Sequence, residues 1–384
     1  MLRILVLSDI HCYAADRVDY QIGFMFSRMS KSPTNRNPLE SLKQLVATHS
    51  DVQVILCPGD LTHQADESAL NYIWSELNAF SKETKIPIIV SPGNHDYDWK
   101  QRHSINAIGL LSRVTPGYPV IGNVSTKYNI LEDGFSLHEA GDFSILNINT
   151  MADARKNPDA DELVISINED RLGKIYLAAN ENRKSKYRIV MLHHHPLAHV
   201  GVQYEGDNDR LINGDQLITE FASFGYHFLL HGHKHLPRLK KTDGLNVLAC
   251  SSFSATGDAH IANNLTNLCH IVNFEDNSKL GRIQSFSFLP MLGWTDQRTS
   301  CFPSIIGFGA EIIDVKVMAQ NIFNQFKLGS QAIIKIDIIN EYAEIIRHLP
   351  PTELSRLNTE LVDGHGIRLN PIPPSHPLYL ESVS

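Results

Sequence analysis

The sequence predicts an α/β fold in which two packed sheets are flanked by helices. Three observations predict this fold. Apolar strand-like runs alternate with amphipathic helical patterns at both ends of residues 1–290, a strand-rich stretch lies between them, and several apolar runs end in Asp, Asn or His. The 384 residues are 42% apolar, which is enough for a full core, and the length suggests one large domain plus an appendage, or two domains.

The first part of the chain alternates strands with helices. Buried strands are expected where short apolar runs end at a break or a polar cluster, at Leu2–Leu7, Val52–Cys57 and Ile86–Val90. Helices are expected where apolar residues recur on one face, at Pro38–His49, Asp66–Glu83 and His103–Leu111. The polar stretch 12–37, between the first strand and the first helix, is long enough to form a lid or a substrate-facing insertion.

The middle of the chain changes character. Residues 127–150 form short strands separated by Asp-Gly and Gly-Asp, a pattern typical of an antiparallel meander. Alternation then resumes, with helices expected at Asn168–Asn182 and Gly214–Phe224. Strands are expected at Tyr187–Leu192, Tyr226–Leu230, Asn246–Cys250, Leu268–Phe274 and Arg282–Phe288.

A domain boundary is expected near residue 290, which separates a domain at 1–290 from an appendage at 291–384. Residues 291–309 are rich in Gly, Pro and Ser and show little periodicity. Two helices are expected beyond them, at Ile312–Phe326 and Ile338–Leu349. The appendage contains no ligand-like cluster, so we expect it to cap the domain or to mediate contacts, oligomer contacts included.

Polar side chains gather where five of the predicted strands end. The clusters are Asp9-Ile10-His11, Gly59-Asp60, Gly93-Asn94-His95-Asp96, His193-His194-His195-Pro196 and Gly232-His233-Lys234-His235. Residues two apart on an extended segment face the same way, so Asp9 and His11 can bind one ion together. The carboxyl ends of strands are the edge at which α/β sheets bind ligands. Carboxylates, an amide and imidazoles at that edge suit a pair of divalent cations.

These five clusters, in this order, resemble the motifs of the calcineurin-like metallophosphoesterase superfamily. The strings Gly59-Asp60-Leu61-Thr62 and Leu230-His231-Gly232-His233-Lys234-His235 look most like the branch of class III cyclic-nucleotide and glycerophosphodiester phosphodiesterases. The resemblance implies a four-layer α/β/β/α sandwich with a dimetal site at strand ends, bridged by Asp60. By this analogy one metal is held by Asp9, His11, Asp60 and His235. The other is held by Asp60, Asn94, His194 and His233.

The resemblance also implies roles for the histidines that are not ligands. The family's ligand in the fourth cluster lies two residues before a Pro, which selects His194, and His193 would then point to the opposite face. His195 becomes a candidate phosphate contact. The leaving oxygen needs a proton or a positive partner, and His95, which lies beside a ligand, suits that role. Asp96 would orient the other ring nitrogen of His95. The mixed donors suit Mn, Fe, Zn or Co.

The composition indicates which kinds of partner and which cellular compartment the protein has. A net charge of −8 and a pI near 6.2 do not favour a nucleic-acid partner, although a small nucleotide held through metals fits. Five scattered cysteines without a Cys-x-x-Cys pair favour a reducing cytoplasm. No apolar run approaches the roughly 20 residues that a membrane helix needs. We therefore expect a soluble, cytoplasmic protein with no membrane partner, and the resemblance implies a phosphate-ester substrate.

Four functions are compatible with these motifs. The first is a phosphodiesterase that acts on a small or nucleotide diester, which the branch resemblance and the acidic pI favour. The second is a phosphomonoesterase or nucleotide pyrophosphatase on the same core. The third is a metal-dependent nuclease whose appendage contacts the nucleic acid. The fourth is a ligand-binding protein without turnover, which the complete ligand set and His95 argue against.

Overall fold

The computed structural model describes most of the chain. It describes residues 1–14, 22–27, 37–98, 107–157, 162–198, 209–256, 265–277, 279–296, 302–328, 332–339 and 341–383. Most of the expected lid at 12–37, and the start of the helix expected at His103–Leu111, lie outside the described residues.

The chain forms two compact units. The larger comprises Leu2–His270 and Phe286–Thr295, and the smaller comprises Met1, Ile271–Ser285 and Asp296–Ser384. The two units are interleaved along the chain, because the chain enters the smaller unit at Ile271, returns to the larger one at Phe286 and leaves it again after Thr295. A single boundary near residue 290 stays a prediction.

The first sheet has the strand order β16-β15-β14-β1-β2-β3-β4, and β17 pairs with β15. The strands are β1 (Leu2–Val6), β2 (Val54–Cys57), β3 (Ile88–Val90), β4 (Val120–Ile121), β14 (Leu268–Phe274), β15 (Gly281–Leu289), β16 (Gly293–Thr295) and β17 (Ile305–Phe308). The strands β1, β2 and β3 run parallel, with Ile4 beside Val54 and Ile55 beside Ile88. All four side chains are fully buried, because both faces of the sheet are covered at these strands. Burial on both faces is why these strands are continuous apolar runs.

The second sheet has the order β12-β13-β11-β10-β7-β6-β5. Its strands are β5 (Ser125–Lys127), β6 (Phe135–Ala140), β7 (Phe143–Ile148), β10 (Tyr187–Leu192), β11 (Phe228–His231), β12 (Arg238–Thr242) and β13 (Leu245–Ala249), while β8 (Arg155–Lys156) and β9 (Leu163–Val164) form a separate pair. The strands β7, β10, β11 and β13 run parallel to their neighbours in this group. The meander expected at 127–150 forms the antiparallel part, β5-β6-β7.

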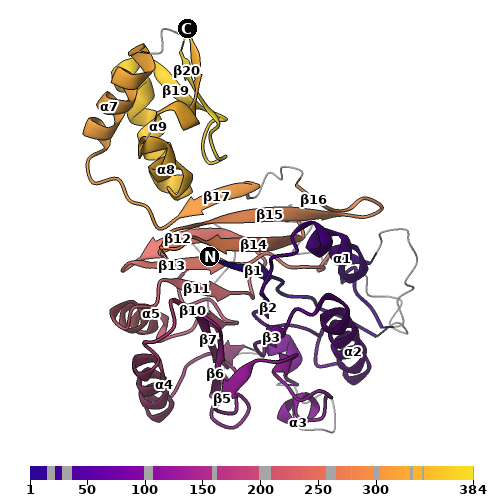
Figure 1. The fold of residues 1–384 in the computed structure, drawn as a ribbon. Coiled ribbons are helices and arrows are strands. Elements are labelled where there is room, and N and C mark those ends of the chain that lie inside the picture. The colour runs from indigo at the N-terminus through magenta and orange to yellow at the C-terminus, as the bar shows by residue number, and fades with distance from the viewer. Residues whose placement is uncertain are drawn as a thin grey trace. The chain divides into compact units, whose positions relative to one another are not determined.

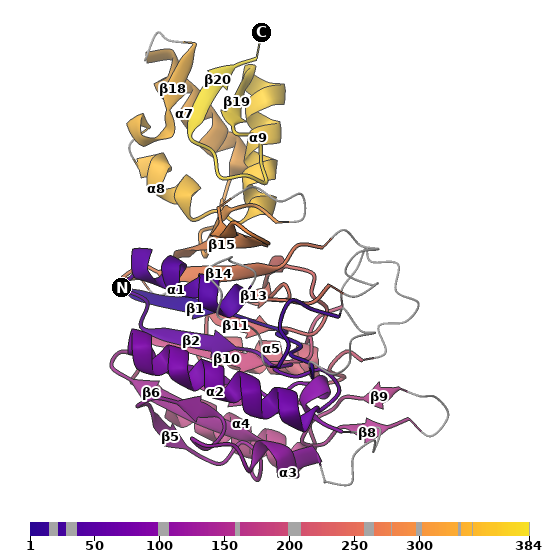
Figure 2. The same ribbon diagram turned by 90° about the vertical axis from the view of Figure 1, so that its right-hand side faces the viewer.

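Helices cover both outer faces of the larger unit. They are α1 (Pro38–Thr48), α2 (Glu67–Thr84), α3 (Ala107–Leu111), α4 (Glu169–Glu181) and α5 (Gly214–Ser223). Figure 1 shows α1 and α2 on one side of the two sheets and α4 and α5 on the other. Figure 2 shows α1 and α2 running alongside β1 and β2. The predicted four-layer α/β/β/α architecture is confirmed.

Side-chain caps fix where these helices begin. The Asn37 side chain accepts hydrogen bonds from the backbone N–H groups of Leu39 and Glu40, and Pro38 occupies the first turn of α1. The Asp66 carboxylate accepts one from Ala69 at the start of α2. Each cap satisfies backbone donors that have no partner inside the helix.

The smaller unit has its own core. After β17 its elements are α7 (Val315–Leu328), β18 (Ile333–Lys335), a short 3₁₀ turn (Ile336–Ile338), α8 (Glu341–Arg347), α9 (Pro351–His365), β19 (Ile367–Asn370) and β20 (Tyr379–Ser382). The three strands pair in the order β18-β20-β19. Ile322 of α7, Leu357 and Leu361 of α9 and Leu380 of β20 are fully buried in one cluster. The helices α7 and α8 correspond to the two predicted there, whereas α9 is not predicted.

Candidate metal centre

The predicted ligands sit where the backbone turns sharply at strand ends. Five of them, Asp9, His11, Asp60, His233 and His235, adopt a left-handed backbone with φ between 49° and 82°. This conformation is uncommon for residues other than glycine, and each instance costs about 1–3 kcal/mol. Strain of this kind persists where the surrounding structure enforces it, and it gathers at functional sites. The backbone therefore marks this edge of the sheets as a site.

The glycines in the motifs make room for the ligands. A Cβ atom on Gly93 would overlap the Asp60 carboxylate, and one on Gly232 would overlap the Asp9 carboxylate and the Ser8 hydroxyl. Any side chain at these two positions would displace a carboxylate. The glycines of the third and fifth motifs are thus needed for close approach, not only for turning the chain.

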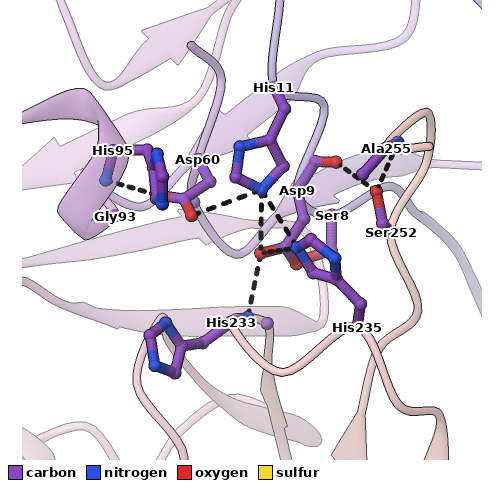
Figure 3. A network of polar contacts seen from close by, with 12 residues as sticks. Ser8, Asp9, His11, Asp60, Gly93, His95, His233, His235, Ser252 and Ala255 are labelled. Atoms are coloured by element: carbon purple, nitrogen blue, oxygen red, sulfur yellow. Dashed lines mark hydrogen bonds and ion pairs between the residues drawn. The ribbon is translucent and has the colours of Figure 1, made fainter. Parts of the chain in front are cut away.

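A first group of side chains converges on Asp9, as Figure 3 shows. The Nε2 atom of His11 lies 3.6 Å from Asp60 Oδ2 and 3.0 Å from His235 Nε2. The Oδ1 atom of Asp9 lies 4.0 Å from His11 Nε2 and 3.5 Å from His235 Nε2. The backbone N–H of His233 donates to the same Asp9 oxygen at 2.9 Å, which holds the carboxylate in place. Two carboxylates and two imidazoles thus face one point.

A second group lies on the other side of Asp60. The Nε2 atom of His193 lies 3.3 Å from Asp60 Oδ2 and 3.0 Å from Asn94 Oδ1. The same Asn94 oxygen lies 3.1 Å from His233 Nδ1. The Nδ1 atom of His193 is 2.7 Å from the Pro58 carbonyl oxygen, which can only accept, so Nδ1 carries the proton. A cation at Nε2 would displace the second proton that the charged ring carries, and the neutral His193 ring would then offer its Nε2 lone pair, as is usual for metal-bound histidines.

Asp60 belongs to both groups, because one of its oxygens faces His11 and His193 at once. Burial opposes ionisation of this carboxyl, but the neighbouring His193 and His95 imidazoles hold its pKa well below the usual range. In return, although burial lowers it, the Asp60 carboxylate raises the pKa of His193 to about 9. A buried carboxylate held between two sets of donors needs positive charge nearby.

The structure corrects the expectation that His193 points away from the site. His193 directly follows β10 and contacts Asp60 and Asn94. His194, the predicted ligand, instead has its Nδ1 atom 2.6 Å from the Thr150 hydroxyl. Its Nε2 atom is buried and has no hydrogen-bond partner among the described residues, and its ring centre lies 4.6 Å from that of His233. His194 thus borders the second group, and whether it binds an ion stays a prediction.

The donor set fits divalent cations. Donors bound to one ion at about 2.0–2.2 Å lie about 2.8–3.6 Å apart in octahedral or tetrahedral geometry. The distances from Asp60 to His11 and His193, and from Asn94 to His193, fall in this range at 3.0–3.6 Å. Burial keeps the pKa of His11 well below its usual value, so the ring is neutral and its lone pair is available. Five sets of three His or Asp residues could each hold an ion here, because the donor atoms within each set lie within 4.8 Å of one another.

His95 lies at the edge of the first group. Its backbone N–H donates to Asp60 Oδ1 at 2.8 Å, and its ring lies 4.8 Å from that of His11 and 4.9 Å from that of His63. Desolvation lowers the pKa of His95, although Asp60 raises it. The ring therefore lies beside the ligands, and with His11 and His63 it forms one of the possible donor groups.

The expected role of Asp96 is wrong. Its Oδ2 atom accepts from the Gly93 backbone N–H at 3.0 Å, and its Oδ1 atom accepts from the Thr62 backbone N–H at 2.9 Å. Both oxygens thus hold the loops that carry Asp60 and Asn94, and they do not orient the His95 ring. Burial, reinforced by the nearby Asp60 charge, raises the pKa of Asp96 to about 7.

His195 lies beside the second group. Its ring is fully buried and stacks on His233, with 5.6 Å between centres and 11° between planes. Contact with a substrate phosphate, the role expected for it, stays a prediction.

Asp209 contacts the ligand His233, and the motifs do not reveal this contact. Its Oδ2 atom lies 2.7 Å from His233 Nε2, and its Oδ1 atom accepts from Lys234 Nζ at 2.5 Å. The carboxylate can only accept, so His233 Nε2 carries the proton and Nδ1 faces the site. The side chains of His233 and Lys234 hold the pKa of Asp209 far below its usual range despite burial. No local pattern distinguishes Asp209 from other surface acids in the sequence, because its partners lie 24 and 25 residues away.

A model of the calcineurin-like phosphoesterase family matches residues 2–237, which is more than half of the chain. The chain belongs to the calcineurin-like phosphoesterase family. The matched range contains all five clusters, and the resemblance proposed from the motifs is confirmed. Proteins of this family typically use a dimetal site, and membership supports a metal-binding hydrolase. The finer resemblance to the class III phosphodiesterases stays a prediction.

Solved structures similar to this calcineurin-like phosphoesterase are distant. Purple acid phosphatase PPD1 from yellow lupin seeds is 13% identical, with 74% of this chain and 51% of that chain covered and a TM-score of 0.45. GAP50, the anchor in the inner membrane complex of Plasmodium, is 13% identical, with 75% and 84% covered and a TM-score of 0.40. A putative 5′-nucleotidase from Staphylococcus aureus is 12% identical, with 72% and 51% covered and a TM-score of 0.40. The match thus spans about half of the phosphatase and the nucleotidase chains.

A search of the curated proteins found no match to the chain. Among the described helices, none combines the length and the apolar character that crossing a membrane requires.

Proposed function

We propose that this calcineurin-like phosphoesterase hydrolyses phosphodiesters with two divalent metal ions. The observation that carries the proposal is the single Asp60 oxygen that lies 3.6 Å from His11 Nε2 and 3.3 Å from His193 Nε2. A carboxylate in that position can be shared by two ions, which is the arrangement of two-metal phosphoesterases.

Each ion would have its own set of ligands. Asp9, His11, Asp60 and His235 would hold one ion, and Asp60, Asn94, His193 and His233 would hold the other. The mixture of carboxylate, amide and imidazole donors suits Mn, Fe, Zn or Co. Divalent ions, when bound, polarise phosphoryl oxygens and lower the pKa of a bound water.

The protein's own groups supply orientation and hydrogen bonds. Asp60 stays ionised and, through its Oδ1 atom, fixes the His95 backbone at 2.8 Å. The His95 ring, which is kept from charging by desolvation, then presents an N–H group to the leaving oxygen, as neutral imidazoles do in other active sites. His195, stacked on His233, is placed to contact a nonbridging phosphate oxygen.

Two features favour a diester over a monoester. The motif strings around Asp60 and His233 resemble those of diesterases, and the chain carries a net charge of −8. A diester has one negative charge at the scissile phosphate and a monoester has up to two, so an acidic protein disfavours the monoester more.

The test is hydrolysis of bis-p-nitrophenyl phosphate beside p-nitrophenyl phosphate, by protein stripped with a chelator and reloaded with Mn²⁺. We expect metal-dependent turnover with a preference for the diester. An Asp60→Ala variant prepared in parallel controls for contaminating phosphatases, and it should lose activity. Preference for the monoester would contradict the diester assignment, and no turnover of either ester would contradict the proposed reaction.

A further inference from the structure

A pocket lies at the edge of the second sheet, beside the metal centre. It is shallow and open to solvent, and it is lined by residues that include Leu197, Ala198, His231, Arg238, Lys240 and Val247. Leu197 and Ala198 follow the fourth motif, and Arg238 and Lys240 belong to β12, which follows the fifth. The walls of the pocket are therefore the segments that leave two of the metal-binding motifs.

The pocket carries two cationic side chains on one face. Arg238 and Lys240 are two residues apart on β12, so they point the same way. The register places Ala249 beside both Arg238 and His231, which makes one row across three strands, and it places Val247 beside Lys240 in a second row on the same face. The His231 side chain in the first row is 1% exposed.

Among the described residues, these two cations lack counter-charges. Within the described part of the chain, neither the Arg238 guanidinium nor the Lys240 ammonium makes a hydrogen bond or an ion pair. Some other cations of the larger unit do: Lys127 pairs with Glu139 at 2.7 Å, and Lys43 pairs with Glu83 at 2.7 Å. Two like charges side by side on an edge strand repel each other unless an anion lies between them. The planar guanidinium and the ammonium together match the oxygens of a phosphate.

The His231 ring, which lines the pocket, lies near the metal centre. The His195 ring centre lies 5.6 Å from that of His233 and 6.4 Å from that of His231. The rings of His233 and His231 are therefore within about 12 Å of each other. This is a distance that a small phosphorylated molecule can span.

We propose that this pocket binds a second phosphate group of the substrate, one that does not react. The inference rests on the proposed phosphoesterase function and names its substrate class: a small ester that carries a second phosphate besides the scissile one. Arg238 and Lys240 contact the second phosphate, and Leu197, Ala198 and Val247 contact the carbon skeleton between the two phosphates. Arg238 and Lys240 determine specificity and take no part in the chemical step.

The test uses two substrates that differ by one phosphate, the p-nitrophenyl ester of thymidine 5′-phosphate and the same ester with an added 3′-phosphate. With the Mn²⁺-loaded protein, we expect a KM that is lower by about tenfold or more for the 3′-phosphorylated ester, because its extra phosphate accepts charge-assisted hydrogen bonds. In an Arg238→Gln/Lys240→Gln double variant, that advantage should vanish while kcat for the simpler ester is unchanged. The matched control is Lys241→Gln, which removes a charge from the opposite face of β12 and should keep the advantage.

A second measurement does not depend on turnover. Inorganic pyrophosphate is titrated calorimetrically into chelator-treated wild type, double variant and control, whose equal thermal midpoints show that all are folded. We expect binding to wild type and to Lys241→Gln, and its loss in the double variant. Equal KM values for the two esters in wild type, or unchanged pyrophosphate binding in the double variant, would overturn the subsite. If the protein hydrolysed neither ester but still bound pyrophosphate, the proposed function would be overturned and the anion site would stand.

Discussion

Replacing Asp209 by Asn should weaken binding of one metal ion. Asp209 Oδ2 lies 2.7 Å from His233 Nε2 and fixes which nitrogen of that ring faces Asn94. Its Oδ1 atom accepts from Lys234 at 2.5 Å and neutralises that ammonium next to a ligand. The amide keeps the shape of the side chain but removes its charge. The His233 ring becomes less basic and Lys234 loses its counter-charge, and both changes disfavour a cation at the second group.

The size of the effect follows from the type of contact. Loss of a carboxylate that supports a ligating histidine typically reduces metal affinity by about 10–100-fold, or about 1.4–2.7 kcal/mol. We expect this reduction for one of the two ions only, because the ligand that Asp209 contacts, His233, belongs to the second group.

The assay is competition between the protein and a fluorescent chelator for Mn²⁺, which reports both affinities without reference to activity. The matched control is Asp215→Asn, which makes the same substitution at a carboxylate whose side chain is 67% exposed and lies 3.6 Å from Arg210. It should leave both affinities unchanged. If Asp209→Asn bound both ions as the wild type does, or lost both equally, the reasoning about His233 would be refuted.

Three further predictions follow from the described contacts. His193→Ala should retain one ion per chain and His194→Ala should retain two by elemental analysis, and the reverse result would make His194 the ligand. His95→Ala should slow turnover by about 10²–10⁴-fold with metal content unchanged, and loss of metal would show that His95 is a ligand. Burial lowers the pKa of His138 to about 4, so the unfolded chain binds a proton below pH 6.5 that the folded chain does not. The free energy of unfolding should therefore fall as pH drops from 6.5 towards 4. Measured by urea denaturation, it should fall by about 2 kcal/mol less in His138→Gln than in wild type between pH 7 and pH 5. Equal losses in the two proteins would contradict this.

The larger unit was readable from the sequence because its strands are buried on both faces. Continuous apolar runs such as those ending at Val6 and Val90 cannot belong to a half-exposed sheet. The polar clusters after them then fall at one edge by topology alone. That is why Asp9, His11 and Asp60 could be brought together before any coordinates.

The choice among three consecutive histidines could not be made locally. Extended chain alternates its side chains, but the first residue after β10 is turned by a contact with the Pro58 carbonyl, 135 residues away. That contact places His193 against Asp60 and Asn94, whereas His194 meets Thr150. The role of Asp209 could not be predicted locally either, because it depends on His233 and Lys234 of the fifth motif. Side-chain direction at a strand end depends on partners that local spacing does not reveal.

The smaller unit was only partly readable, although some signals were present. No element is predicted over Pro351–His365, yet Pro351 occupies the first turn of α9 and Gly366 ends it with φ of 65°. The buried Leu354, Leu357 and Leu361 recur every three or four residues between them. The strands β19 and β20, by contrast, have four residues each and flank a Pro-rich stretch, and their pairing is long-range. Short edge segments of this kind carry little periodicity to recognise.

The central claim is that Asp60 joins two metal ions in one site. Its most direct test is the number of Mn²⁺ ions bound per folded chain, measured by elemental analysis of wild type and of Asp60→Asn after removal of free metal. We predict two ions in the wild type and fewer than one in the variant, because both ions share the lost charge. One ion in the wild type, or two ions retained by the variant, would contradict the account.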